Sequence, residues 1–296
     1  MNKENNYQKI TIVIVLYKEE YNLIYKTLDK IRSFKKIIVD NANNLELKKK
    51  IQSEFFIDQY ILNKKNNGFS AGYNQGVKLN NSEFSLVLGP DCIISENNIN
   101  ILFDSFLKEK NCFLVSPTAY NENSKLSYAG GPLPENGGKN KILDLKGNVC
   151  VESTLGACML FRTKDFIDLG LFDENFFVYF SDDDLCRRIK LKKKSIIQIY
   201  DSKCIHSHGI VKIKNKYFKK FIRENNYIFD NLYYFYKIDK NHVSIKSFQK
   251  KIIPYLFKFI LKILTFNFLG AVEIFSKVLG YLRFIYKIKW RDGRVV

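Results

Sequence analysis

The sequence lacks several patterns that would place it in a well-known class at once. No glycine-rich run ends in Gly-Lys-Ser/Thr, which excludes a P-loop nucleotide site, and no Gly-x-Gly-x-x-Gly follows the first apolar run. The six cysteines are scattered without a Cys-x-x-Cys pair. This argues against a cysteine zinc site and favours buried thiols in a reducing compartment.

Long uncharged apolar runs and acidic residues are also scarce. The N-terminal residues carry no apolar stretch, so we expect no secretory signal. A transmembrane helix needs about 20 largely uncharged residues, and Lys258 and Lys262 interrupt the most apolar window. The 30 acidic residues stand against 48 basic ones, for a formal net charge of +18. This excess points to an anionic partner, which could be nucleic acid, anionic lipid or a phosphorylated substrate.

Apolar runs do alternate with helical patterns in the N-terminal part of the chain. The runs expected to form strands are residues 10–17, 36–40, 59–62 and 84–88. Strands that alternate with helices at this spacing predict a parallel α/β sheet. Tyr17, Asp40 and Asn63 stand at or just beyond strand ends. In such a sheet these ends form one rim, where a mononucleotide can bind.

A glycine-rich segment follows the third run. Gly68, Gly72 and Gly76 are spaced four apart, with Asn67 and Asn74 beside and between them. The pattern predicts a helix that begins near Gly68 and carries small residues on one face. Such a face lets a ligand or another backbone approach closely, and the helix start offers N–H groups to phosphate. Tight helix packing is the alternative.

Carboxylates stand at two further places. Asp91 follows a Gly-Pro break after the run at 84–88, where it could cap a helix or hold a divalent cation or a sugar. Three consecutive aspartates, Asp182 to Asp184, begin another expected helix. Acidic residues stabilise a helix start, but three adjacent carboxylates repel one another. We therefore expect one of them to act as a general base, with its pKa set by its neighbours.

Two of the three histidines, His206 and His208, follow an expected strand at 195–200 within one loop. Lone histidines are usually structural, but two in one loop can also ligate a metal, and both roles remain open here.

Taken together, these segments resemble the family 2 glycosyltransferases of the GT-A fold, and most of all the bacterial rhamnosyltransferase-type members. The resemblance covers roughly residues 9–235. The matching segments are the strand ending in Tyr17, Val39-Asp40-Asn41, Asn67 to Gly76, Leu88 to Asp91, Gly156-Ala157, Phe172-Asp-Glu, Asp182 to Leu185 with Arg188, and His206. It implies a Rossmann-like α/β domain with a mostly parallel sheet at residues 1–236, followed by a basic amphipathic helical region at 237–296.

The resemblance also implies roles for particular residues. The donor-binding residues would be Tyr17, Asp40, Asn67, Gly68, Gly72, Asn74 and Asp91. Asp182 would be the general base, and the acceptor side would comprise Gly156, Ala157 and Asp184. Asp91 and His206, with His208 in reserve, would hold Mg²⁺ or Mn²⁺. Three positions depart from the family: Gly89 stands where Asp or Asn is usual, Ser181 where Glu is common, and Lys18 where an Asn often follows the tyrosine of the first strand.

The reaction implied is an inverting single displacement. Asp182 would deprotonate an acceptor hydroxyl, a nucleoside diphosphate would leave, and a divalent cation would offset its charge. Rhamnose is the favoured sugar, with galactose, glucose or N-acetylhexosamine as alternatives, and the acceptor would be a lipid-linked saccharide in bacterial surface polysaccharide synthesis. A non-catalytic basic binding protein is the alternative from another class. Nucleic acid is not expected as a partner, because the positive charge is spread widely and enriched beside apolar residues.

The C-terminal region combines lysines with large apolar residues. Lys246, Lys250, Lys258 and Lys262 recur at multiples of four, which places them on one helical face. Helices of this kind insert flat into an anionic leaflet. We therefore expect peripheral binding to the cytoplasmic face of the inner (cytoplasmic) membrane. A helical cap on the catalytic domain or a homodimer contact is the alternative.

Overall fold

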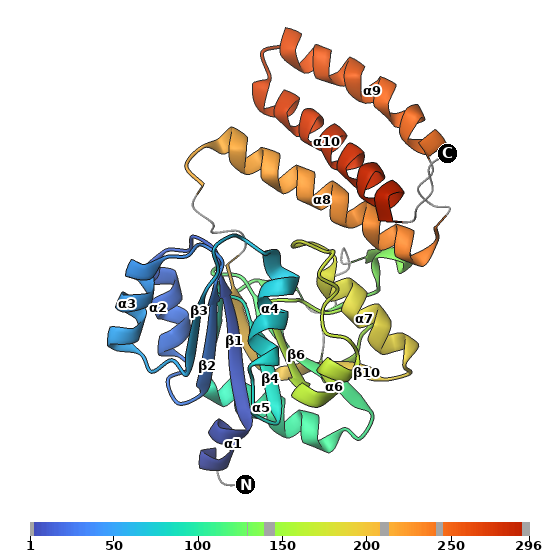
Figure 1. Ribbon diagram of the computed structural model, residues 1–296. Coiled ribbons are helices and arrows are strands. Elements are labelled where there is room, and N and C mark those ends of the chain that lie inside the picture. The colour runs from blue at the N-terminus through green and yellow to red at the C-terminus, as the bar shows by residue number, and fades with distance from the viewer. Residues whose placement is uncertain (1–2, 129, 139–145, 208–212, 241–244, 292–296) are drawn as a thin grey trace. The chain divides into compact units, whose positions relative to one another are not determined.

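The computed structural model describes residues 3–128, 130–138, 146–207, 213–240 and 245–291, and the chain divides into two compact units (Figure 1). Unit 1 comprises Met1–Glu174 and Ser181–Lys212, and unit 2 comprises Asn175–Phe180 and Ile213–Val296. The sequence placed the domain boundary after residue 236. The compact units instead divide near residue 213, and unit 2 also takes in a short segment from the middle of the chain.

The described strands of unit 1 form a single mixed sheet. Their bounds are β1 Ile10–Leu16, β2 Lys35–Asp40, β3 Gln59–Leu62, β4 Phe84–Leu88, β5 Cys92–Ile94, β6 Cys112–Tyr120, β7 Leu126–Tyr128, β8 Val149–Cys150, β9 Cys158–Arg162 and β10 Ser195–His206. The order is β3-β2-β1-β4-β9-β6-β10-β5, with β7 beside β6 and β8 beside β10. Strands β3, β2, β1 and β4 are mutually parallel, whereas β9 runs antiparallel to β4 and β6. The predicted α/β sheet is confirmed.

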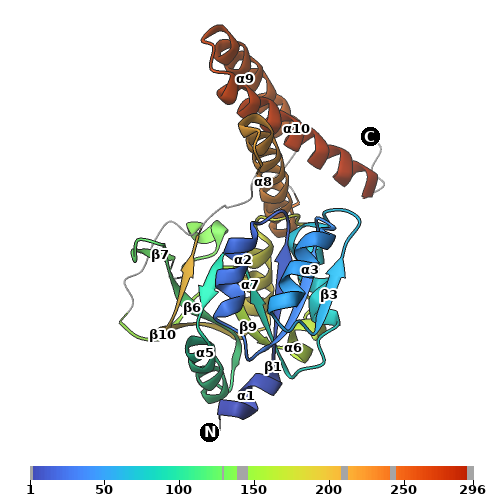
Figure 2. The ribbon, with the colours of Figure 1, turned by 90° about the vertical axis from the view of Figure 1, so that its left-hand side faces the viewer.

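Helices cover both faces of this sheet (Figure 2). The helices of unit 1 are α1 Lys3–Lys9, α2 Tyr21–Asp29, α3 Leu45–Glu54, α4 Gly68–Lys78, α5 Glu96–Lys108, α6 Thr163–Asp168 and α7 Ser181–Leu191, with a 3₁₀ turn at Pro134–Asn136. Helices α2, α3 and α5 share one buried cluster, and α4, α6 and α7 share the other.

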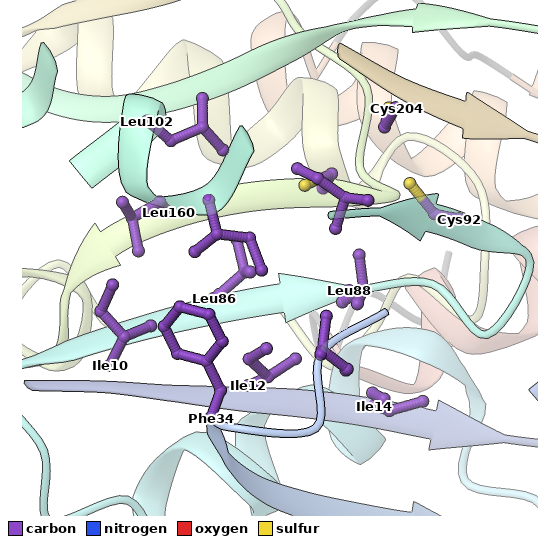
Figure 3. Packing of buried hydrophobic residues seen from close by; sticks show 14 of the residues in the cluster. Ile10, Ile12, Ile14, Phe34, Leu86, Leu88, Cys92, Leu102, Leu160 and Cys204 are labelled. Atoms are coloured by element: carbon purple, nitrogen blue, oxygen red, sulfur yellow. The ribbon is translucent and has the colours of Figure 1, made fainter. Parts of the chain in front are cut away.

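The first strand shows why its sequence folds this way. Successive side chains of a strand point to opposite faces, so Ile10, Ile12 and Ile14 enter one cluster while Val13 enters the other. Figure 3 shows the three isoleucines in a row, with Leu86 and Leu88 of β4 beside them. A continuous β-branched run is what a strand buried on both faces requires.

The strand ends do form one rim. The amide of Asn41 donates to Leu16 O at 2.8 Å, and the amide of Asn63 donates to Asp40 O at 2.8 Å. The side chain of Asn63 also donates to Asn41 Oδ1 at 2.9 Å. Polar groups therefore line the carboxyl ends of three neighbouring strands.

Unit 2 is built mainly from three helices, α8 Lys216–Ile238, α9 Ile245–Leu264 and α10 Phe268–Arg291. They lie side by side in Figure 1, with α10 packed against both α8 and α9. Phe229 and Leu232 of α8 meet Tyr281 and Phe284 of α10 in a small buried core. Asn215 caps the start of α8 by accepting from the amides of the next turn.

Candidate active site

The two predicted metal ligands of unit 1 come together. Strand β5 begins directly after Asp91 and pairs antiparallel with the end of β10, so that Cys92 lies opposite His206. The Nε2 atom of His206 is 3.4 Å from Asp91 Oδ1. The sequence placed His206 in a loop after residue 200, but β10 continues to His206, and strand pairing fixes its position. His208 lies outside the described residues.

Asp91 and His206 suit a divalent cation whose other ligands come from a bound molecule. In the part of the chain that the structure describes, no group of three or more His, Cys, Asp or Glu side chains could hold a metal. A carboxylate and an imidazole could complete a Mg²⁺ or Mn²⁺ shell with diphosphate oxygens and water. A Cβ at Gly89 would lie 3.0 Å from Asp91 Oδ1 and 3.5 Å from the Ala157 Cβ. Gly89 therefore packs close to Asp91 rather than adding a ligand.

Glu19 is a candidate site residue that the sequence argument missed. Its Oε2 accepts a hydrogen bond from the Tyr17 amide at 2.5 Å, in a turn where Lys18 has a φ of 63°. Burial raises the pKa of Glu19 to about 7, and the charges of Asp91 and Asp40 also raise it. A carboxylate three residues beyond β1, at the rim, was the available signal.

Asp40 lies beneath the rim rather than on it. Its side chain is fully buried and accepts from the amides of Ala42 at 2.7 Å and Asn44 at 3.2 Å, and from the Tyr60 hydroxyl at 3.2 Å. These bonds shape the turn after β2. Direct contact of Asp40 with a nucleotide stays a prediction, and the described geometry shows a support for the turn.

The glycine-rich helix α4 packs tightly against β1. Gly68 begins the helix with a φ of 84°, and its carbonyl accepts from Asn41 Nδ2 at 3.1 Å. A Cβ at Gly72 would lie 2.8 Å from Val15 Cγ1, and one at Gly76 would lie 2.3 Å from Val13 Cγ1. Close helix packing therefore accounts for two of the three glycines.

Asn67 and Asn74, the predicted donor contacts on this segment, differ in what they touch. Asn67 precedes α4, and its side chain makes no capping bond. Asn74 is buried, with its Oδ1 accepting from the Phe172 amide at 3.0 Å and its Nδ2 donating to Phe172 O at 2.9 Å and Glu174 at 3.0 Å. The side-chain amide of Asn74 thus joins the Asn67 to Gly76 segment to the Phe172-Asp-Glu segment.

The segment from Gly68 to Gly72 has the Gly-x-Ser-x-Gly spacing of a nucleophile elbow, with Ser70 at its centre. Ser70 lies inside α4, is fully buried and shares a hydrogen bond of 2.7 Å with the Ser181 hydroxyl. A nucleophile elbow instead exposes its serine on a strand-to-helix turn. Ser70 is therefore a packing residue.

Asp182 is the accessible member of the aspartate triplet. Its side chain is half-buried, whereas Asp183 and Asp184 are buried. The Gly156 amide donates to Asp182 Oδ2 at 3.1 Å, and the Asp183 amide donates to Oδ1 at 3.1 Å. Two backbone donors fix the carboxylate in one orientation, which suits a general base.

The side chains of Asp183 and Asp184 bond to other parts of the fold. Asp183 Oδ1 accepts from the Ser153 hydroxyl at 2.6 Å. Asp184 pairs with Arg188 at 2.9 Å, and the same guanidinium donates to the carbonyls of Leu169 at 3.0 Å and Leu171 at 2.6 Å. The described contacts of Asp184 are structural, and its predicted acceptor contact stays a prediction.

Gly156 and Ala157 join the two halves of the site. Gly156 contacts Asp182, as above, and the Ala157 carbonyl accepts from the Gly89 amide at 2.8 Å. Strands β4 and β9 are antiparallel, so the end of one lies beside the start of the other. The base candidate and the Asp91 carboxylate therefore stand at the same edge of the sheet.

Comparisons with known proteins show the family to which the chain belongs. Residues 11–170 match the model of glycosyl transferase family 2. The chain is 27% identical over 218 residues, or 68% of each protein, to the low-salt glycan biosynthesis hexosyltransferase Agl10 of Haloferax volcanii. It is 24% identical over 192 residues to the dTDP-rhamnosyl transferase RfbF of Shigella flexneri, covering 60% of this chain and 61% of that protein.

Two solved structures share the GT-A fold. The crystal structure of GalNAc-T7 with UDP, GalNAc and Mn²⁺ matches with a TM-score of 0.56 at 14% identity, covering 85% of this chain and 57% of that one. The mannosyltransferase PcManGT of Pyrobaculum calidifontis, in complex with GDP-Man and Mn²⁺, matches with a TM-score of 0.53 at 11% identity, covering 94% of this chain and 87% of that one.

Proposed function

Because the chain belongs to glycosyl transferase family 2, we propose that it moves rhamnose, with inversion, from a nucleoside-diphosphate sugar to a lipid-linked saccharide in surface polysaccharide synthesis. Glycosyltransferase activity on a nucleotide-sugar donor follows from the family, and the sugar, the acceptor and the pathway are the proposal. The rhamnosyl transferase relative supports rhamnose. The hexosyltransferase relative favours a hexose such as galactose or glucose as the second candidate.

The observation that carries the mechanism is the pair of backbone amides that orient Asp182. In the proposed step its carboxylate takes the proton of an acceptor hydroxyl, and the oxygen bonds to the anomeric carbon. The bond from that carbon to the diphosphate breaks, and the nucleoside diphosphate leaves with the electron pair. Asp91 and His206 would hold Mg²⁺ or Mn²⁺, which supplies positive charge to the departing diphosphate.

A screen of nucleotide sugars tests this function. Binding and transfer are measured for dTDP-rhamnose and for UDP- and GDP-linked hexoses and N-acetylhexosamines, each with and without Mn²⁺. Asp182→Asn should lower transfer by a factor on the order of 10²–10⁴ and leave donor binding unchanged. Unchanged turnover would overturn the base assignment, and transfer from a hexose donor alone would replace rhamnose.

We further propose that unit 2 binds an anionic membrane surface at the cytoplasmic face of the inner membrane. The large apolar residues exposed on the described part of α9 are Ile253, Leu256, Phe257, Ile260, Leu261, Ile263 and Leu264. Their spacing of three and four places them on one helical face. Lys250 and Lys258 are exposed on the same helix and could meet anionic headgroups.

The hydropathy of the described helices bears on how unit 2 could bind a bilayer. Among the described helices, none has a window apolar enough to cross a membrane. The geometry therefore favours insertion parallel to the surface. A homodimer formed through this apolar face is the alternative.

A further inference from the structure

Helix α8 holds the segment that immediately precedes α7. Asn175–Phe180 belongs to unit 2 although its neighbours on both sides belong to unit 1. The carboxylate of Asp230, which has no exposed surface, accepts from the amides of Phe177 at 3.1 Å, Val178 at 3.0 Å and Tyr179 at 2.9 Å. Three successive backbone donors thus converge on one buried side chain.

The three backbone hydrogen bonds to Asp230 are charge-assisted when its carboxylate is ionised. Hydrogen bonds to an ionised carboxylate are shorter and stronger than those between neutral groups. Burial raises the pKa of Asp230 to about 6, while the three backbone donors and the charge of Arg283 act in the opposite direction. At neutral pH the side chain is therefore an ionised acceptor, and its removal would leave three backbone donors without their partner.

The last residue of the segment supplies a second observation. Phe180 has a φ of 60°, in the left-handed region that residues other than glycine rarely adopt. Its ring lies 5.6 Å from Tyr227 and 5.4 Å from Tyr234, both on α8. A strained residue persists where its surroundings hold it, and α8 supplies those surroundings.

Helix α8 is itself anchored by α10. Arg283 Nη1 donates to Asn225 Oδ1 at 2.7 Å and to Asn226 Oδ1 at 2.9 Å, and its guanidinium lies 4.2 Å from the centre of the Phe229 ring. Helix α8, which holds the segment at 177–180, is therefore itself fixed by contacts with α10.

From this arrangement we infer that Asp230 is a positioning residue for the general base. Phe180 is joined by a peptide bond to Ser181, the first residue of α7, and Asp182 follows. Because the chain is continuous here, we expect that holding the backbone at 177–180 restrains the backbone torsions through which the chain enters α7, and through them the Asp182 carboxylate. Asp230 touches no reacting atom and acts only through this backbone. The inference rests on the proposed role of Asp182.

Hydrogen–deuterium exchange of the full chain tests the positioning without any substrate. Asp230→Ala should speed exchange at the amides of residues 177–179. It should also speed exchange at least tenfold at the amides of Gly156 and Asp183, which bond to Asp182. Asp230→Asn, which keeps one acceptor oxygen, should give a smaller increase at the same amides.

Glu273→Gln is the matched control. It weakens the ion pairs of Glu273 with Lys220 and Lys277, each 2.6 Å long, elsewhere in unit 2. It should leave exchange at Gly156 and Asp183 unchanged. The inference is overturned if both Asp230 variants leave these two amides unchanged, or if Glu273→Gln speeds their exchange equally.

Kinetics with the donor and acceptor found in the screen give a second readout. Asp230→Asn should lower kcat about tenfold while the KM for the donor stays within twofold, and Glu273→Gln should keep kcat. An unchanged kcat beside faster exchange would overturn the positioning of the base. The exchange result does not depend on activity, so failure of the proposed function is seen separately, in an inactive wild-type chain.

Discussion

The Gly156 amide donates a hydrogen bond to Asp182 Oδ2 over 3.1 Å, and a Cβ on the same glycine would press against the Asp182 side chain. A residue in the turn two positions before β9 thus both orients the base and lies against it. Its small size and its N–H group serve one purpose, because each holds the carboxylate in place.

Gly156→Ala should therefore impair catalysis more than folding. A Cβ at this position would lie 3.1 Å from the Asp182 Cβ and 3.2 Å from Oδ2, so the base must shift. Since small misplacements of a catalytic group can cost up to about 100-fold, we expect kcat to fall by a factor on the order of 10–100. Donor KM and the melting temperature should change little. Steady-state kinetics check this, and a kcat within twofold of wild type would contradict it.

Gly76→Ala should instead destabilise the fold. The new Cβ would lie 2.3 Å from Val13 Cγ1 in a fully buried contact between α4 and β1. Overpacking of this kind costs about 1–3 kcal/mol of unfolding free energy. Gly147→Ala is the matched control, because its Cβ would meet nothing within 4 Å. Urea unfolding measures both, and equal stability of the two variants would show that α4 can move away from β1.

Glu19 should make stability depend on pH. Its pKa in the folded chain is raised to about 7 from an ordinary 4.5. The proton that it retains stabilises the fold fully below pH 4.5, and this contribution is lost as pH rises through 7. Relative to Glu19→Gln, wild type should lose on the order of 1–3 kcal/mol between pH 5 and pH 8. Chemical unfolding of both proteins at the two pH values measures the difference, and a difference that stays constant would place the Glu19 pKa outside this range.

Charges on the apolar face of α9 should release the protein from lipid. Phe257 and Leu264 are 68% and 69% exposed. Replacing both with Glu puts like charge against anionic headgroups, so binding to phosphatidylserine-containing vesicles should fall at least tenfold. Tyr286→Glu, at a 65% exposed position on α10, is the control and should bind as wild type.

Co-sedimentation with vesicles and light scattering together separate the two uses of this face. Unchanged vesicle binding by the double variant would contradict the membrane proposal. A wild-type dimer that becomes a monomer in the double variant would support the dimer instead.

The sequence predicted the parallel half of the sheet well, because β1 to β4 are local units with clear apolar runs. It did not predict β5, which has three residues and exists through its pairing with β10. For the same reason it placed the end of β10 too early and put His206 in a loop. Short strands that depend on distant partners carry little local signal.

The site was predicted unevenly for a related reason. Asp91 and His206 lie within 3.4 Å of each other, and two backbone amides orient Asp182, while their roles stay predictions. Asp40, Asn74 and Asp184 have equally suitable side chains, but their described bonds are to neighbouring parts of the fold. Asp230 offered no motif at all, since its role depends on contacts with amides more than 50 residues earlier in the chain, such as that of Tyr179, 51 residues away.

The passage of Asn175–Phe180 through unit 2 bears on how the protein is made. During synthesis this stretch leaves the ribosome some 50 residues before Asp230 does, since Asp230 follows Tyr179 by 51 positions. Until α8 emerges, the amides and aromatic rings of Asn175–Phe180 lack the contacts with α8 described above. The nascent sheet can form early, but the entry to the Asp182 helix is completed late. A fragment that ends at residue 212 would therefore contain Asn175–Phe180 but lack α8, which would have to be supplied as a separate chain.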